Sequence, residues 1–305
     1  MTRSTFRILS AGLLALTLVA TACGSDDDSS GTSGGQTRGP IVIGGFNFPE
    51  SSILANIYAG ALRNDGYTAS VRPNLGSREV VAPALEKGDI SAYIGYAATD
   101  LEFWDNNAGL ASADAADEVK KMNTYLQPKG LLALDAGLAV DQNAFGVTPA
   151  TADKFKLKKV SDLTAVAPQL TLGGPPECPT RPFCQPGLEQ TYGAKFKTFK
   201  ALDAGGPLTK TALRNGDIDV GLLFTSDATG FVILEDDKKL QKADAVVPIV
   251  NASKVDDGAR SVMNKVSGKL TTQALQEMND KVNVNKEDPE AVAGAWLTQN
   301  GFAKK

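Results

Sequence analysis

Past its N-terminal tail, the chain alternates short apolar runs with stretches whose apolar residues follow a helical period. The runs at 41–43 and 170–172 each meet a Gly-Gly pair, which permits a sharp backbone turn. After the first pair, apolar residues recur at three- and four-residue spacing from Ile53 to Leu62, as on one face of a helix. The pattern therefore predicts a strand, a turn and a helix at the start of each half.

The two halves repeat one pattern. Residues 84–90 (ALEKGDI) match residues 212–218 (ALRNGDI), and both copies continue to an aromatic residue, Tyr96 or Phe224. The further strands predicted are 68–72 and 90–96 in the first half, and 195–199 and 218–224 in the second. Each half then has the order βαβαβ, which favours a mostly parallel sheet with helices on both faces.

The repeat predicts two lobes that face each other across a cleft. Asn143–Thr148 and Val246–Val250 are the candidate crossovers, so lobe 1 is expected to span 41–145 plus 246–305 and lobe 2 to span 146–245. Helical patterns near 255–269, 272–282 and 289–300 are expected to pack on lobe 1. Ligands bind outside the carboxyl ends of strands in open α/β sheets. Tyr96 and Phe224 fall at such ends, where they border the cleft or, alternatively, belong to the sheet cores.

The N-terminus has the layout of a signal peptide over residues 1–22. Arg3 and Arg7 precede an uncharged, mostly apolar run that stops at Cys23. The run is shorter than the ~20 residues that a membrane-spanning helix needs. Small residues before Cys23 resemble a bacterial lipobox, although Ala20 stands where leucine is usual. Acylation of Cys23 is therefore expected, and cleavage with plain secretion is the alternative.

Residues 23–40 are mostly Gly, Ser, Thr and Asp after the cysteine, which is typical of a flexible tether. The expected location is the extracytoplasmic face of the plasma membrane, through the lipid anchor. The net charge of −4 is spread along the chain without a basic stripe, which argues against a nucleic-acid partner.

Cys178 and Cys184 remain as a pair. In an exported protein such a pair indicates a disulfide, and the alternative is two ligands of a metal. Because the chain has no histidine, a metal site would lack partners and Ser-His-Asp or Cys-His nucleophiles are excluded. The carboxylates Asp217 and Asp219, or those of 235–237, fit a strand start and a solvated turn better than acid/base chemistry. No enzymatic activity, metal or cofactor is expected.

Several stretches together resemble the glycine betaine/choline/proline binding lipoproteins of osmoprotectant ABC importers, with the closest likeness to actinobacterial members. These stretches are Phe46–Ser51, Leu75–Glu79, Ala84–Tyr96, Thr180–Pro182 and Gly187-Leu188. The likeness covers roughly residues 41–302, and the actinobacterial type shares 173–192 with both cysteines.

The resemblance implies a type II periplasmic-binding-protein fold, an ABC permease as partner and a monomeric protein that delivers a small solute by lobe closure. It also implies a cage of aromatic rings that holds a quaternary ammonium group by cation–π attraction, with an arginine for the carboxylate. Tyr96 matches a cage position and Arg181 the arginine. The ligand-binding residues implied are Phe46, Asn47, Phe48, Tyr96, Arg181, Phe224, Thr225 and Asp227.

The sequence departs from the family pattern in ways that bear on the solute. A tyrosine usual after Gly76-Ser77 is Val81 here, and the late cage tyrosine expected in 241–244 is missing. Fewer π faces weaken the binding of a trimethylammonium group by a few kcal/mol. Either Phe46, Phe48 and Trp104 rebuild an aromatic wall, or the importer serves a different small solute, amino acid-like or aromatic. A regulatory sensor of the same fold would need a DNA-binding or signalling module, and the sequence offers none.

Overall fold

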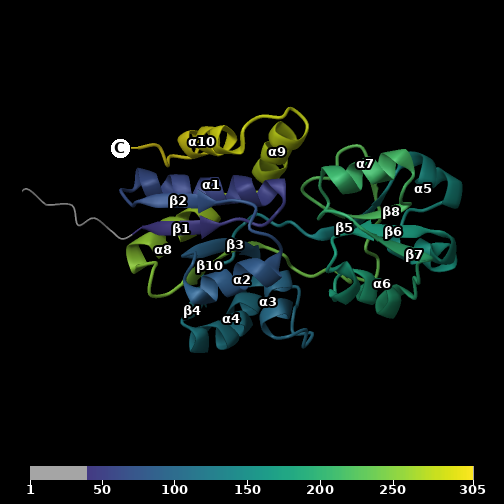
Figure 1. The fold of residues 1–305 in the computed structure, drawn as a ribbon, viewed down its shortest axis with the longest axis horizontal. Helices are drawn as coiled ribbons and strands as arrows, with labels where there is room; N and C mark the ends of the chain where they lie inside the picture. Colours follow the sequence, from purple (N-terminus) through teal and green to yellow (C-terminus); the bar gives the residue numbers. More distant parts are fainter. Residues whose placement is uncertain (1–39, 305) are drawn as a thin grey trace, which may run out of the picture. The chain divides into compact units, whose positions relative to one another are not determined.

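The structure is a computed structural model that describes residues 40–304. The predicted signal peptide, Cys23 and the tether up to residue 39 lie outside the described residues. Between residues 40 and 304, no helix combines the length and the apolarity needed to cross a bilayer. The described chain forms two lobes, each built on a five-stranded sheet (Figure 1).

Lobe 1 is built on a sheet with the strand order β2-β1-β3-β10-β4. Its strands are β1 (Ile41–Gly44), β2 (Ala69–Arg72), β3 (Ala92–Tyr96), β4 (Leu131–Ala133) and β10 (Val246–Asn251). Its helices are α1 (Pro49–Asn64), α2 (Arg78–Lys87), α3 (Ala97–Trp104), α4 (Ala115–Leu126), η1 (Gln127–Lys129), α8 (Asp257–Ser267), α9 (Thr272–Asn283) and α10 (Pro289–Gln299). β1 is parallel to β2 and β3, whereas β10 is antiparallel to β3 and β4.

Both faces of the lobe 1 sheet are buried. One core packs the sheet against α1, α8, α9 and α10, and a second core packs it against α2, α3 and α4 (Figure 1). β10 serves both cores, because successive side chains of a strand point to opposite faces. Val246 and Val250 lie in the first core, and Val247 and Ile249 in the second. The continuous apolar run of β10 follows from this double burial.

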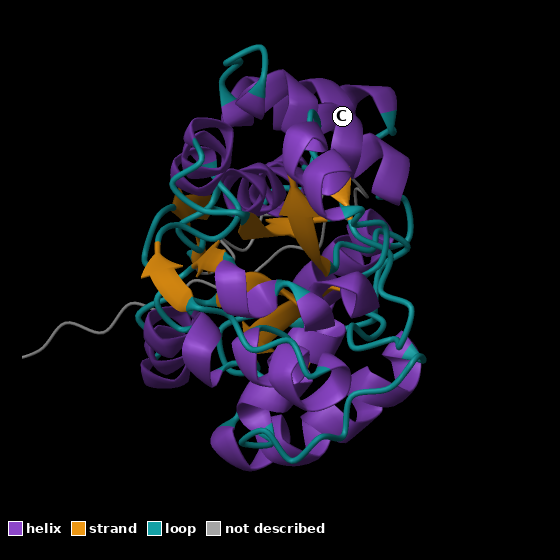
Figure 2. Ribbon diagram, turned by 90° about the vertical axis from the view of Figure 1, so that its right-hand side faces the viewer, coloured by secondary structure: helices purple, strands orange, loops and turns teal. Residues whose placement is uncertain are grey.

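Lobe 2 has the same arrangement, with the strand order β7-β6-β8-β5-β9. Its strands are β5 (Asn143–Val147), β6 (Thr171–Gly174), β7 (Thr198–Ala201), β8 (Val220–Phe224) and β9 (Val232–Ile233). Its helices are α5 (Pro149–Phe155), η2 (Val160–Ala165), η3 (Ala167–Gln169), η4 (Cys178–Thr180), α6 (Gln185–Tyr192) and α7 (Pro207–Asn215). β6 is parallel to β7 and β8, and β5 is antiparallel to β8 and β9. Figure 2 shows the strands flanked by helices on both sides.

The predicted repeat is confirmed at its most specific point. α2 and α7 end at Gly88 and Gly216, whose φ angles of 78° and 74° lie in the left-handed region that favours glycine at a helix end. β3 and β8 follow within a few residues. β7 begins at Thr198, three residues later than predicted, because the backbone amide of Lys197 instead donates to the carbonyls of Ala167 and Leu170.

The crossovers lie earlier in the chain than the sequence suggested. Asn143–Val147 is strand β5 of lobe 2, and Val246–Asn251 is strand β10 of lobe 1. The segments between the lobes run just before these strands, where Val140 and Ala245 form an isolated antiparallel bridge. The expected boundary at residue 145 is therefore corrected, because the apolar run that looked like a linker pairs along its length with β8.

Cys178 and Cys184 form the disulfide. Both side chains are buried in the lobe 2 core. The bond closes a short loop between η4 and α6, which carries Arg181 and Phe183. The two sulfur atoms are thus bonded to each other and do not form half of a metal site. Within residues 40–304, no cluster of three potential metal ligands occurs.

Candidate functional site

A cavity of about 100 Å³ lies between the two lobes, a size suited to a small solute. Its lining includes Phe46, Asn47, Phe48, Arg78, Tyr96, Thr99 and Glu102 from lobe 1, Glu177, Cys178, Arg181, Phe183, Leu222 and Phe224 from lobe 2, and Asp141 and Asp244 from the crossing segments. The cavity lies at the carboxyl ends of β1, β3, β6 and β8, where open α/β sheets bind ligands. The repeat thus brings Tyr96 and Phe224 together at one cavity.

Aromatic rings from both lobes form one wall of the cavity. The Phe48 ring centroid lies 5.4 Å from that of Phe224 and 6.3 Å from that of Tyr96. Phe46 stacks on Phe48 at 5.7 Å. Phe48 is the N-cap residue of α1, and Tyr96 ends β3, so rigid elements hold both rings. This wall offers π faces to an apolar or cationic group.

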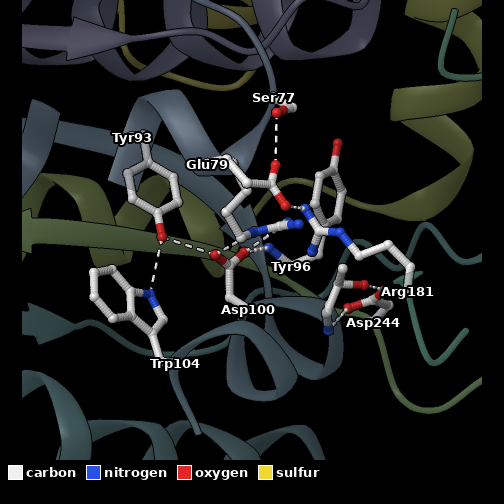
Figure 3. A network of polar contacts seen from close by, with 10 residues as sticks. Ser77, Glu79, Tyr93, Tyr96, Asp100, Trp104, Arg181 and Asp244 are labelled. Carbon is white, nitrogen blue, oxygen red and sulfur yellow. Dashed lines mark hydrogen bonds and ion pairs between the residues drawn. The ribbon is translucent and has the colours of Figure 1, made fainter. Parts of the chain in front are cut away.

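Arg181 supplies a cationic group in the same cavity (Figure 3). Its Nη2 donates to Oε1 of Glu79 at 2.7 Å, and this ion pair joins lobe 2 to α2 of lobe 1. Ser77 Oγ donates to the other oxygen of Glu79 at 2.6 Å. The Nε of Arg181 is buried and has no hydrogen-bond partner. Burial, with repulsion from Arg78, lowers the pKa of Arg181. The guanidinium therefore retains a donor that an anionic ligand group can satisfy.

A second arginine of the cavity, Arg78, is already neutralised by Asp100. Its Nε and Nη2 donate to the two carboxylate oxygens of Asp100 at 2.7 and 3.1 Å, and both side chains are buried. Asp100 also accepts from the hydroxyl of Tyr93 at 2.7 Å and from the backbone amide of Tyr96 at 2.8 Å. This buried pair therefore holds the turn from β3 to α3, and with it the backbone of Tyr96.

The hydroxyl of Tyr96 points away from the cavity into a buried polar network. It donates to Oε1 of Glu50 at 2.6 Å. Oε2 of Glu50 accepts from Ser226 Oγ at 2.6 Å and from Asn279 Nδ2 at 2.5 Å. The backbone amide of Ser226 donates to Oδ1 of Asp141 at 2.8 Å. The network links α1, the segment after β8 and a crossing segment, so it couples both lobes behind the aromatic wall.

Three buried carboxyl groups lie close to this wall. Burial raises the pKa of Glu50, and burial together with the nearby Glu50 raises that of Asp141 well above its ordinary value. Burial also raises the pKa of Asp244 to about 6. Asp244 accepts from the backbone amide of Thr99 at 2.9 Å and from its hydroxyl. A cation at the neighbouring rings would favour the ionised forms of these carboxyl groups, because opposite charges attract strongly where water is excluded.

Two of the residues implied by the resemblance lie outside the cavity lining. Thr225 donates through its hydroxyl to Asp141 at 3.2 Å. Asp227 forms an ion pair with Lys210 at 2.6 Å and accepts from Asn283 at 2.7 Å. The turn after β8 therefore directs both side chains toward neighbouring elements. They organise the turn that follows Phe224.

The suggested aromatic role of Trp104 is likewise not supported. Trp104 is not among the cavity-lining residues, and its Nε1 donates to the hydroxyl of Tyr93 at 3.2 Å (Figure 3). Val81 is fully buried in the second core of lobe 1. The aromatic wall is thus built by Phe46 and Phe48 without Trp104.

Sequence reasoning missed several residues of the site and its support, among them the charged residues Glu50, Arg78, Asp141 and Asp244. Glu50 and Arg78 fall inside the stretches 46–51 and 75–79 that carry the family resemblance, and this was the available signal. The two aspartates lie in the crossing segments, whose position only the fold reveals. The carboxylates weighed and set aside for acid/base chemistry lie outside the cavity lining, and Asp219 accepts from the backbone amide of Thr171 at 2.8 Å.

Comparison with known proteins agrees with this architecture. Residues 39–299 match the family model described as the substrate binding domain of ABC-type glycine betaine transport system. The carnitine transport binding protein OpuCC of Listeria monocytogenes is 27% identical over 291 residues, 88% of this chain and 89% of its own. The glycine betaine-binding protein YehZ of Escherichia coli K12 is 25% identical, over 88% of this chain and 93% of its own.

A solved structure described as a glycine betaine/carnitine/choline ABC transporter shares the fold. Its TM-score is 0.66 at 24% sequence identity, over 86% of this chain and 99% of that one. The family match covers most of the chain, including every element that lines the cavity. The chain therefore belongs to the family of substrate-binding domains of ABC-type glycine betaine transport systems.

Proposed function

We propose that the protein binds a small zwitterion or cation with a quaternary ammonium group, of the glycine betaine, carnitine or choline class, and delivers it to an ABC permease. One observation carries the proposal: aromatic rings from both lobes share a cavity with an arginine that keeps a buried, unpartnered donor. A methylated ammonium cannot donate hydrogen bonds, so ring faces suit it. A carboxylate suits the guanidinium.

Lobe closure is the mechanism that this geometry supports. Phe48 and Phe224 meet across the lobes, as do Glu79 and Arg181. A solute between the rings and the guanidinium adds contacts to both lobes at once, and so favours the closed state over the open one. We propose that the closed face is the one that the permease recognises. We also propose that the protein is monomeric and works on the extracytoplasmic side of the membrane, anchored through Cys23.

A second candidate keeps the importer role but changes the solute. The wall contains one tyrosine, Tyr96, with the phenylalanines Phe46, Phe48 and Phe224. Phenylalanine rings lack the hydroxyl of a tyrosine cage and accept an apolar or aromatic group equally well. This composition favours an amino acid-like or aromatic solute as the alternative.

Calorimetry on the purified protein tests the proposal. Glycine betaine, carnitine and choline are expected to bind, and a panel of proline and neutral aromatic solutes is not. If an aromatic solute binds and none of the three ammonium compounds does, the proposed solute class is wrong, while the proposed role in import still stands.

Arg181→Gln tests whether Arg181 binds the carboxylate of the solute. A hydrogen bond to a charged group contributes about 1.5–3 kcal/mol, so glycine betaine affinity is expected to fall roughly 10- to 150-fold. Choline has no carboxylate and serves as the internal control; its affinity should fall only by about two- to fivefold, which is the cost of losing the pair with Glu79. An equal loss for both compounds would show that Arg181 only supports the fold.

A further inference from the structure

We infer that Glu50 is a specificity-determining residue that selects a cationic solute, acting through the ring of Tyr96 and without touching the solute. The inference rests on the proposed function and names a residue that the cavity lining does not include. The ring of Tyr96 lines the cavity, and its hydroxyl donates to Glu50 on the far side at 2.6 Å. Glu50 itself is only 4% exposed.

The hydrogen-bond pattern of Glu50 is that of a carboxylate anion. An ionised carboxyl group only accepts hydrogen bonds, and three side chains donate to Glu50: Tyr96, Ser226 and Asn279. Asp141 lies beside it: burial raises the pKa of both carboxyl groups, the hydrogen bonds to Glu50 offset part of the rise at Glu50, and the neighbouring Glu50 raises the pKa of Asp141 further. The three donors favour the charge of this pair on Glu50.

Within the described part of the chain, no basic side chain neutralises this charge. Among residues 40–304, no lysine or arginine forms an ion pair with Glu50 or Asp141. Arg78 is paired with Asp100, and Lys210 with Asp227. A buried charge without a partner is costly. A cationic solute on the cavity side of the ring supplies the missing opposite charge.

Tyr96 transmits the charge because its proton stays on the phenol. Burial and the neighbouring Glu50 raise the pKa of Tyr96 well above its ordinary value. A phenol that donates a strong hydrogen bond to a carboxylate has a more electron-rich ring, and a cation is attracted to the ring face by its electrostatic potential. The low dielectric of the closed cavity strengthens this attraction. A neutral solute of the same shape gains nothing from it.

The test compares choline with 3,3-dimethylbutan-1-ol, in which carbon replaces the ammonium nitrogen. Glu50→Gln keeps the shape and removes the charge. Choline affinity is expected to fall about tenfold or more, while the affinity for the neutral alcohol stays within about twofold. Glu118→Gln, which removes another buried carboxyl group of lobe 1 outside the cavity, is the matched control and should leave the ratio of the two affinities unchanged.

Each outcome has a defined meaning. An equal loss for both compounds in Glu50→Gln would show that Glu50 only supports the fold, and would overturn the inference. If Glu50→Gln does not fold, Tyr96→Phe keeps the ring and breaks the hydrogen bond, and the ratio should again fall. An unchanged ratio in Tyr96→Phe would refute transmission through the ring. Wild-type protein that binds neither choline nor glycine betaine would instead overturn the proposed function itself.

Discussion

Glu118 makes the stability of lobe 1 depend on pH. Its side chain is fully buried on α4, with Oε1 accepting from the backbone amide of Ser112 at 2.8 Å. Oε2 is buried without a partner. Burial raises the pKa of Glu118 from its ordinary 4.5 to about 8. The folded protein therefore holds a proton at neutral pH that the unfolded chain releases.

The sign and size of the effect follow from this difference. Because the pKa of Glu118 is higher in the folded than in the unfolded protein, protonation of Glu118 stabilises the fold. This stabilisation is fully present below pH 4.5 and is lost as the pH rises through about 8. The shift corresponds to at most about 5 kcal/mol, and because the protein relaxes around a newly ionised buried group, the expected loss is about 2 kcal/mol. Glu118→Gln stays neutral throughout, so it should not show this loss.

Denaturant unfolding followed by tryptophan fluorescence measures the unfolding free energy of wild type and variant at each pH. Both tryptophans, Trp104 on α3 and Trp296 on α10, report on lobe 1. Between pH 5 and 8, wild type should lose about 2 kcal/mol more unfolding free energy than Glu118→Gln. Asp117→Asn is the matched control, because its neighbouring carboxylate is exposed and paired with Lys121, and it should retain the wild-type slope. Identical slopes for wild type and Glu118→Gln would refute the reasoning.

Three further predictions concern the ion pair across the lobes, the packing at two glycines and the disulfide. Glu79→Gln removes the pair with Arg181 and should weaken choline binding about two- to fivefold at ~0.05 M salt and less at ~0.5 M, whereas Glu86→Gln, whose pair stays inside lobe 1, should leave the affinity unchanged. A loss of affinity that does not depend on salt would contradict the pairing. Gly187→Ala places a Cβ 2.1 Å from a backbone oxygen and should lower the free energy of unfolding, measured with denaturant, by about 1–3 kcal/mol. Gly294→Ala places its Cβ in open space on a helix and should raise the free energy of unfolding by up to about 1 kcal/mol. Equal effects of the two substitutions would refute the packing argument. Reduction of the disulfide should lower the unfolding free energy by about 2 kcal/mol, given the six-residue separation. It should also weaken the binding of glycine betaine more than that of choline, because the disulfide-closed loop positions Arg181. Equal weakening of both ligands would show that the disulfide does not position this arginine.

The internal repeat allowed most of the fold to be predicted. Strand, Gly-Gly turn and Gly-terminated helix are local features, and the glycines at 88 and 216 of the repeated stretch each end a helix. Tyr96 and Phe224 were placed at one cavity because equivalent strand ends in paired lobes face each other. The crossovers could not be located in the same way, since an apolar strand and an apolar linker look alike until their pairing partners are known.

The site was predicted less completely because its residues act through partners that are remote in the sequence. Thr225 and Asp227 follow Phe224 directly, yet the turn carries them out of the cavity. Glu50 accepts hydrogen bonds from Ser226 and Asn279, which lie 176 and 229 residues away in the sequence, so its role could not be read from its neighbours in the chain.

By itself, the sequence determined the two-lobe α/β plan, the disulfide pair, the absence of histidine chemistry and the aromatic and cationic character of the site. The first three follow from periodicity, glycine positions and composition, which are properties of the chain read locally, whereas the character of the site follows from the resemblance to the osmoprotectant-binding family. Only the tertiary structure decided that Arg78 is neutralised while Arg181 keeps a free donor, and that a buried carboxylate lies behind the ring of Tyr96. The physical reason is that charge pairing and burial depend on which side chains the fold brings together.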